Sequence, residues 1–254
     1  MFEGRALIDR SFGLSTRHLC GSSKVGNVKP PRSEAAKRTL GLWRDFPRSA
    51  RLHTNIRWWT APFEALEVEV PRSGNILEVG CGHGVFTTFL AVSSVERRVV
   101  GIDIDAEKIA LAKQSVLGLR DGEANLSFDH RASGDVPLID GGWDAIVFAD
   151  VLYLLPLEAR TALLAECVDA LSMNGVLVVK EVDTAPKFKA QIAQFQEFLA
   201  TKVLRITDGD ALDFPSAAEL EGLLVSDGLE TRVARLDKGY FHPHCVVVGR
   251  KTQT

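Results

Sequence analysis

Short apolar runs alternate with amphipathic segments through most of the chain. Runs of about four to eight residues rich in Val, Ile, Leu and Phe are typical of buried strands, and longer segments with apolar residues every three or four positions are typical of helices. The predicted strands are residues 76–79, 99–102, 124–128, 143–149 and 175–182, with a closing pair at 229–236 and 244–248. The predicted helices of this region are residues 85–94, 106–119, 156–171, 186–204 and 216–227. This alternation predicts an α/β fold with a doubly wound, Rossmann-like sheet of seven strands.

The N-terminal quarter has a different pattern. Residues 1–32 lack periodicity, whereas Ser33 is a suitable N-cap for a helix that carries Ala36, Leu40 and Trp43. A second helix is predicted over residues 49–63. We therefore expect residues 1–69 to form a basic arm and a helical cap, and residues 70–254 to form the core domain.

Three glycines and one acid mark a ligand site within the first predicted β-α-β unit. Gly80, Gly82 and Gly84 follow the first strand at alternate positions, and Asp103 ends the second strand. Glycine reaches positive φ without strain and lets a ligand approach the backbone, and the start of the next helix offers unpaired N–H groups. A carboxylate at the tip of strand 2 can accept hydrogen bonds from ribose hydroxyls. The pattern indicates a nucleoside ligand with a polar or anionic tail.

The spacing Glu78-x-Gly80-x-Gly82-x-Gly84 resembles the first motif of the class I S-adenosylmethionine-dependent methyltransferases. It differs from the G-x-G-x-x-G of dinucleotide folds. The resemblance covers about residues 70 to 250. It implies the strand order 3-2-1-4-5-7-6 with strand 7 antiparallel, and S-adenosyl-L-methionine as the cofactor.

The resemblance also assigns roles to single residues. Glu78 and the loop from Gly80 through Cys81 and Gly82 to Gly84 would hold the methionine part of the cofactor, with Cys81 a small residue in a crowded turn rather than a nucleophile. Asp103 would bind the ribose, and Ile104 would pack against adenine. The positions after strand 4 that the family uses fall on Asp150 and Val151, and the position after strand 3 falls near Asp129 or else on Ala132 or Ser133. Asp129 is shifted from the place where the family has its adenine-binding acid, and Asp150 has an alternative role as an N-cap.

Other residues are candidates for the acceptor side of the site. An antiparallel strand 7 would begin at the active edge, which makes His242 and His244 candidate general bases, with structural histidines as the alternative. His83 and Tyr153 are expected to line the pocket. Trp58 and Trp59 are expected either to line it or to anchor the cap to the core.

Charge and composition narrow the partners. Residues 1–60 contain 12 Lys and Arg against 4 Asp and Glu, although the whole chain has a formal net charge of −3. The basic part either lies on the acidic body or meets an anionic substrate or membrane surface. No transmembrane segment, secretory signal, paired cysteines or metal site is expected, and the default compartment is cytoplasmic. No nucleic-acid partner is expected, because strand 4 is not followed by the N/D-P-P-[YFW] motif.

The predicted function is methyl transfer from S-adenosylmethionine to a small-molecule or lipid-like acceptor. The apolar residues 151–155 and the aromatic, arginine-rich cap favour such an acceptor. Residues 33–63 are expected to close over the pocket. Two alternatives are a S-adenosylmethionine-binding partner protein without catalysis and an NAD-dependent oxidoreductase.

Overall fold

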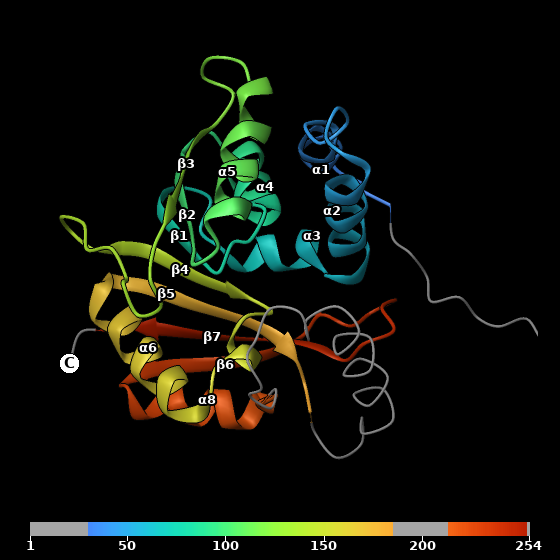
Figure 1. Ribbon diagram of the computed structural model, residues 1–254. Helices are drawn as coiled ribbons and strands as arrows, with labels where there is room; N and C mark the ends of the chain where they lie inside the picture. Colours follow the sequence, from blue (N-terminus) through green and yellow to red (C-terminus); the bar gives the residue numbers. More distant parts are fainter. Residues whose placement is uncertain (1–29, 185–212, 253–254) are drawn as a thin grey trace, which may run out of the picture.

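The computed structural model describes residues 30–184 and 213–252, and its centre is a seven-stranded sheet (Figure 1). Its order is β3-β2-β1-β4-β5-β7-β6, and β7 is antiparallel to both of its neighbours. The strands are β1 (Gly74–Val79), β2 (Arg97–Asp103), β3 (Asn125–His130), β4 (Trp143–Ala149), β5 (Leu171–Val182), β6 (Leu229–Arg235) and β7 (His244–Lys251). The order and the direction of β7 confirm the predicted topology.

Helices cover both faces of the sheet (Figure 1). On one face α4 and α5 pack on β1, β2 and β3, and on the other α6 and α8 pack on β4, β5 and β7. Strands that are covered on both faces have nearly continuous apolar sequences, so β4 and β5 could be predicted from the sequence. The helices of this part are α4 (Val85–Ser93), α5 (Ala106–Ser115), α6 (Leu157–Ala170) and α8 (Ala217–Ser226).

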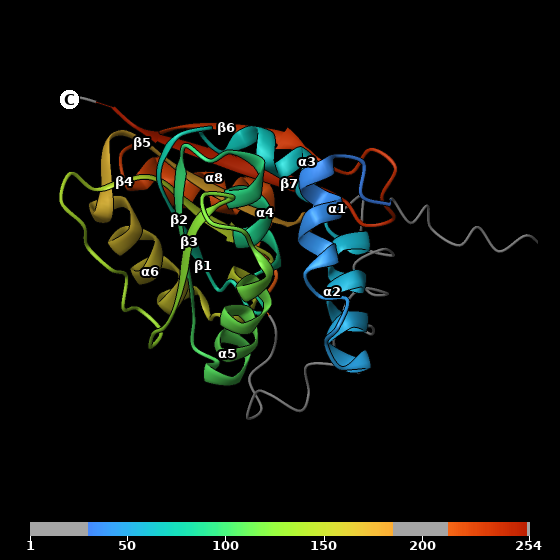
Figure 2. The same ribbon diagram turned by 90° about the horizontal axis from the view of Figure 1, so that it is seen from above.

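The N-terminal helices pack beside α4, as both views show (Figure 1, Figure 2). They are α1 (Glu34–Gly41), α2 (Arg48–Thr60) and the short α3 (Phe63–Leu66). Trp58 of α2 meets Phe63 and Phe89 edge-to-face, and Phe63 stacks on Phe86 of α4. The cap and the sheet therefore share one hydrophobic cluster, and the division of the chain at residue 70 stays a prediction.

Helix starts follow the predicted capping residues. The Ser33 hydroxyl accepts a hydrogen bond from the Ala36 N–H at 3.2 Å, and the Asp105 carboxylate caps α5. Ser216 and Glu219 form a complete capping box at α8. Each cap satisfies N–H groups that the first helical turn leaves unpaired.

The largest boundary differences from the sequence prediction are at the end of α5 and at the start of β5. The helix expected over residues 106–119 ends at Ser115 and continues as the 3-10 turn Val116–Gly118. β5 begins at Leu171 instead of Gly175, since the chain passes from α6 into the strand without a loop. The helix predicted over residues 186–204 lies outside the described residues.

Candidate cofactor and acceptor site

The glycine loop sits between the ends of β1 and β2. The N–H groups of Gly80 and Cys81 both donate to the Ile102 carbonyl, at 2.8 and 3.0 Å, which holds the loop against strand 2. A Cβ on Gly80 would lie 2.6 Å from the Val151 side chain, so the loops after β1 and β4 are in direct contact. A Cβ on Gly84, whose φ is +70°, would lie 2.3 Å from the Phe128 ring. These glycines are required by close approach, in addition to their backbone conformation.

Gly82 lies on the open side of the same loop. A Cβ there would meet no atom within 4 Å, and its φ is +55°. Its N–H donates to Asp103 Oδ2 at 2.7 Å. The backbone at this point is therefore accessible to a ligand, which is what a cofactor tail beside the loop requires.

Asp103 is oriented by two backbone groups. Oδ2 accepts from Gly82, and Oδ1 accepts from the Asp105 N–H at 2.9 Å. Each carboxylate oxygen keeps acceptor capacity for a second donor, so the fixed carboxylate can bind two ribose hydroxyls. The next residue, Ile104, is 67% exposed, so its side chain is available as an apolar surface for the adenine ring. The residues present fit a nucleoside cofactor.

We predict that Asp103→Ala weakens S-adenosylmethionine binding by at least about tenfold. The change removes acceptors for two hydroxyls, and a hydrogen bond to a charged group contributes about 1.5–3 kcal/mol. Calorimetric Kd values measure this. Asp121→Ala serves as a control, because it removes an exposed carboxylate from the turn before β3. Equal affinities of Asp103→Ala and the unmodified protein would remove Asp103 from the site.

Glu78, near the end of β1, and Cys81, in the loop, are both buried rather than on the open surface of the loop. Glu78 is buried on β1 and accepts a hydrogen bond from the Thr87 hydroxyl of α4. Burial raises the pKa of Glu78 to about 7. Burial also raises the pKa of the Cys81 thiol, which agrees with a packing residue and not with a nucleophile.

The adenine side of the predicted site is less complete. Asp103 is paired with His130 across the strands, so Asp129 lies on the opposite face of the sheet from Asp103. His130 Nε2 is 3.1 Å from the Ile104 carbonyl and fixes the loop after β2. Asp129 as the reader of adenine stays a prediction.

The cap reaches the glycine loop through aromatic contacts. The ring of His83 lies 4.5 Å from that of His53 in α2, and 5.9 Å from that of Trp43. Burial lowers the pKa of His83, so the ring is neutral at pH 7. His83 therefore joins the cap to the cofactor loop.

Charged side chains converge at the carboxyl ends of β4 and β5. Asp150, in the left-handed region at φ 56°, binds Arg57 Nη1 of α2 through Oδ2 at 2.6 Å and Lys180 Nζ of β5 through Oδ1. Arg57 Nη2 also donates to the Ala149 carbonyl at 2.5 Å. Burial opposes the charge on Asp150, but Lys180 and Arg57 outweigh it and hold the pKa of Asp150 below its usual range. The carboxylate thus makes ion pairs instead of capping a helix.

Glu181 supports the loop that follows. Its Oε1 accepts from the N–H groups of Val151 and Leu152 at 2.9 and 2.7 Å. Burial, with Asp150 nearby, raises the pKa of Glu181 to about 8. Burial therefore opposes the ionisation of Glu181, whereas its two backbone hydrogen bonds favour it.

His244 and His242 lie at the same edge. His244 begins β7 opposite Val182, the last residue of β5, and it is buried. Burial and the charge of Lys180 lower the pKa of His244 well below its ordinary value, and the pKa of His242 is lowered for the same reasons. Both are neutral at pH 7, and their role as general bases stays a prediction. Tyr153 is buried and stacks on Phe214, with ring centroids 4.8 Å apart.

The two cap tryptophans occupy different environments. Trp58 is 3% exposed and packs between Phe63 and Phe89, as the anchoring alternative requires. Trp59 is 36% exposed. It lies about 200° around α2 from Arg57, so it is turned away from the ionic cluster.

Sequence reasoning missed Lys180, Glu181 and His53 as site residues. Lys180 and Glu181 are two charged residues at the end of an otherwise apolar strand, a signal that was present in the sequence. His53 carries no such signal, because its contact with His83 depends on how α2 packs. Within the described ranges, no cluster of His, Cys, Asp or Glu is suited to a metal ion. No helix in those ranges is long and apolar enough to cross a membrane.

Comparison with known proteins identifies the family. A family model described as a methyltransferase domain matches residues 76–175, the stretch from β1 into β5 that holds the glycine loop, Asp103 and Asp150. The chain belongs to the class I S-adenosylmethionine-dependent methyltransferases. Its cofactor is S-adenosylmethionine, which the residues around Gly82 and Asp103 fit.

Individual relatives show the extent of the likeness. The fatty-acid O-methyltransferase of Mycolicibacterium smegmatis is 27% identical over 161 residues, which are 63% of this chain and 54% of that protein. The chain thus spans about half the length of this curated relative. Magnesium protoporphyrin IX methyltransferase of Synechocystis has a TM-score of 0.58 at 14% identity, over 85% of this chain and 94% of that one. An O-methyltransferase family protein from Burkholderia thailandensis has a TM-score of 0.65 at 10% identity, over 84% and 62%. The two solved structures share the fold.

Proposed function

We propose that the protein transfers a methyl group from S-adenosylmethionine to the carboxylate of a lipid-like small molecule. The observation that carries the proposal is a pair of cations at the carboxyl ends of β4 and β5. Two cations, Arg57 and Lys180, face one ionised carboxylate, Asp150. Burial raises the pKa of Glu181 and lowers the pKa of His244, so burial shifts both groups toward their neutral forms beside the two cations. A buried cation attracts an anionic acceptor more strongly than the same charge in water.

Arg57 is the residue suited to contact the acceptor. Its side chain is 31% exposed, whereas Lys180 is fully buried beneath it. A guanidinium has five N–H donors, and the bonds to Asp150 and Ala149 use two of them. The remaining donors can bind an acceptor carboxylate while Asp150 and Lys180 hold the guanidinium in place.

The chemistry of a carboxylate suits this site. A carboxylate oxygen attacks the methyl carbon, the new C–O bond forms as the C–S bond breaks, and the electron pair passes to sulfur. A methyl ester and S-adenosylhomocysteine result. The acceptor is already deprotonated at neutral pH, so the reaction needs alignment and exclusion of water but no general base. The lowered pKa values of His242 and His244 are compatible with this reaction, because no side chain has to remove a proton from the acceptor.

The named relative supports the same class of acceptor. The M. smegmatis protein is a fatty-acid O-methyltransferase, and a fatty acid combines a carboxylate with an apolar chain. Of the apolar residues that follow Asp150, Leu154 is 40% exposed and Val151 and Leu155 are partly exposed, which offers an apolar surface of matching character.

The test is a product assay on the full chain. Long-chain fatty acids, the matched fatty alcohols and a phenol are each incubated with S-adenosylmethionine, and S-adenosylhomocysteine and methylated product are quantified by mass spectrometry. We expect equal amounts of S-adenosylhomocysteine and methyl ester with the acids, and at least about tenfold less with the alcohols. Methylation of the alcohol or phenol in preference to the acid contradicts the proposal. Calorimetric binding of S-adenosylmethionine without turnover of any acceptor favours the non-catalytic binding protein.

A further inference from the structure

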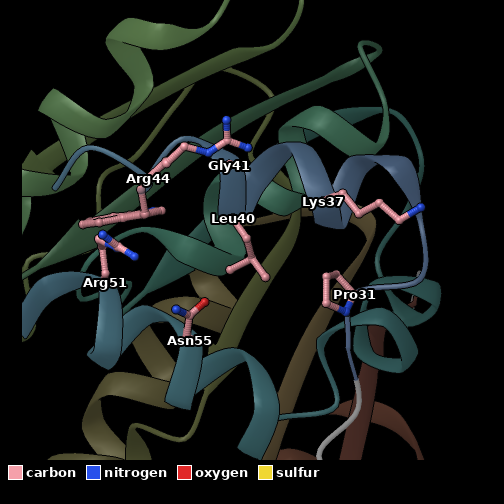
Figure 3. Close-up of a pocket in the computed structure, with 8 residues that line it drawn as sticks. Pro31, Lys37, Leu40, Gly41, Arg44, Arg51 and Asn55 are labelled. Carbon is pink, nitrogen blue, oxygen red and sulfur yellow. The ribbon is translucent and has the colours of Figure 1, made fainter. Parts of the chain in front are cut away.

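A pocket of about 340 Å³ opens between α1 and α2 (Figure 3). Figure 3 shows Lys37 and Leu40 on α1, and Arg51 and Asn55 on α2, around it. Its lining residues are Pro31, Lys37, Leu40, Gly41, Trp43, Arg44, Arg51 and Asn55.

The lining carries three cations and no carboxylate. Lys37 pairs with Glu34, which lies outside the lining, at 2.7 Å. Arg44 and Arg51 are exposed and make no ion pair or hydrogen bond to other described residues. Two guanidinium groups that line one pocket with no carboxylate in its lining can together attract a phosphate.

Apolar side chains continue from the pocket along the outer face of α2. Leu52 is 57% exposed and Trp59 is 36% exposed. At 100° per residue, Arg51, Asn55, Arg48, Trp59 and Leu52 fall within an arc of about 100°, so the pocket and the exposed residues share one side of the helix. Arg57 and His53, which face the cofactor site, lie outside that arc.

We propose that this pocket binds the phosphate of an anionic phospholipid and seats the cap on a membrane surface. The mixture of cations, an exposed Trp and an exposed Leu on one helix face is typical of elements that lie in the interface of a bilayer. Each basic residue near an anionic surface contributes attraction, and residues 1–60 carry twelve of them against four acids. The cap would then face the membrane while its opposite side faces the cofactor site.

The first test is co-sedimentation of the full chain with vesicles. Vesicles of phosphatidylcholine alone are compared with vesicles that contain phosphatidylglycerol. We expect binding only to the anionic vesicles, and a loss of roughly thirtyfold in affinity for the double variant Arg44→Gln, Arg51→Gln. The matched control is Arg98→Gln, Arg250→Gln, which removes the same charge from two exposed positions outside the pocket, near the start of β2 and near the end of β7. Melting temperatures verify that both double variants are folded.

Three outcomes would overturn the proposal. They are an absence of vesicle binding, equal losses in the two double variants, and binding of inorganic phosphate at this pocket without binding of vesicles. The last would indicate a site for a free anion.

A second measurement needs no change of charge. Trp43, Trp58 and Trp143 are buried, so Trp59 is the tryptophan that lipid can reach among those described. Brominated anionic lipids should quench the protein's fluorescence, and Trp59→Phe should abolish that quenching. Quenching that persists unchanged in Trp59→Phe argues against this face of α2.

Discussion

Replacing Arg57 with Met should lower kcat/KM for a carboxylic acid acceptor by about thirtyfold or more, with S-adenosylmethionine affinity changed by less than about threefold. The substitution removes the exposed cation of the cluster and leaves Asp150 and Lys180 to neutralise each other. Loss of one partner of a buried, hydrogen-bonded charge pair costs about 2–5 kcal/mol, and each 1.4 kcal/mol is tenfold in rate. The measurement is steady-state kinetics with a long-chain fatty acid, beside the calorimetric Kd of the cofactor.

Two further variants separate recognition from folding. Arg57→Lys keeps the charge but cannot reach Asp150 and the Ala149 carbonyl together, so we expect an intermediate loss. Arg97→Met removes another buried arginine, which pairs with Glu67 at 2.7 Å at the far edge of the sheet. That control should lose stability and keep its acceptor kinetics. If Arg57→Met also loses stability but keeps its acceptor kinetics, the cluster serves only to join the cap to the core. That result would contradict the proposal of a carboxylate acceptor.

The sheet could be read from the sequence because its signals are local. Each buried strand is a continuous apolar run, the glycine positions follow β1 directly, and Ser33, Asp105 and Ser216 stand at helix starts with side chains that can cap. The strand order came from the family resemblance. Local pattern could not have given it, since pairing of β1 with β4 joins segments about 70 residues apart.

The ionic cluster illustrates what local pattern misses. Asp150 was expected beside the cofactor or as an N-cap, and its two partners come from α2 and from β5. Arg57 is one of several arginines in the cap, and nothing in the sequence separates it from Arg48 or Arg51. The packing of α2 on α4 places Arg57 over the end of β4. The same packing leaves Arg48 and Arg51 on the exposed side of α2. The side chains that define an acceptor site depend on such packing more than the cofactor loop does.

The role of Trp58 also depends on how α2 packs, but here the packing places the side chain in the core. Its pairing with Trp59 in the sequence allowed both a pocket and a packing role, because aromatic side chains serve either. In the structure the Trp58 ring lies 5.6 Å from that of Phe63 and 5.1 Å from that of Phe89, so it joins α2, α3 and α4. Its neighbour Trp59 lies on the solvent side of the same helix.

Trp58→Ala should therefore lower the free energy of unfolding by about 3–5 kcal/mol, the usual cost of removing a large aromatic side chain from a core. Trp59→Ala, one position away and partly exposed, should lower it by less than about 1 kcal/mol. Chemical denaturation of both variants measures the difference. Trp58→Phe is the conservative check and should recover part of the loss. Acceptor KM of the folded fraction of Trp58→Ala should stay near that of the unmodified protein, since the side chain does not reach the cluster around Arg57. A normal free energy of unfolding combined with a raised acceptor KM would instead return Trp58 to the substrate pocket.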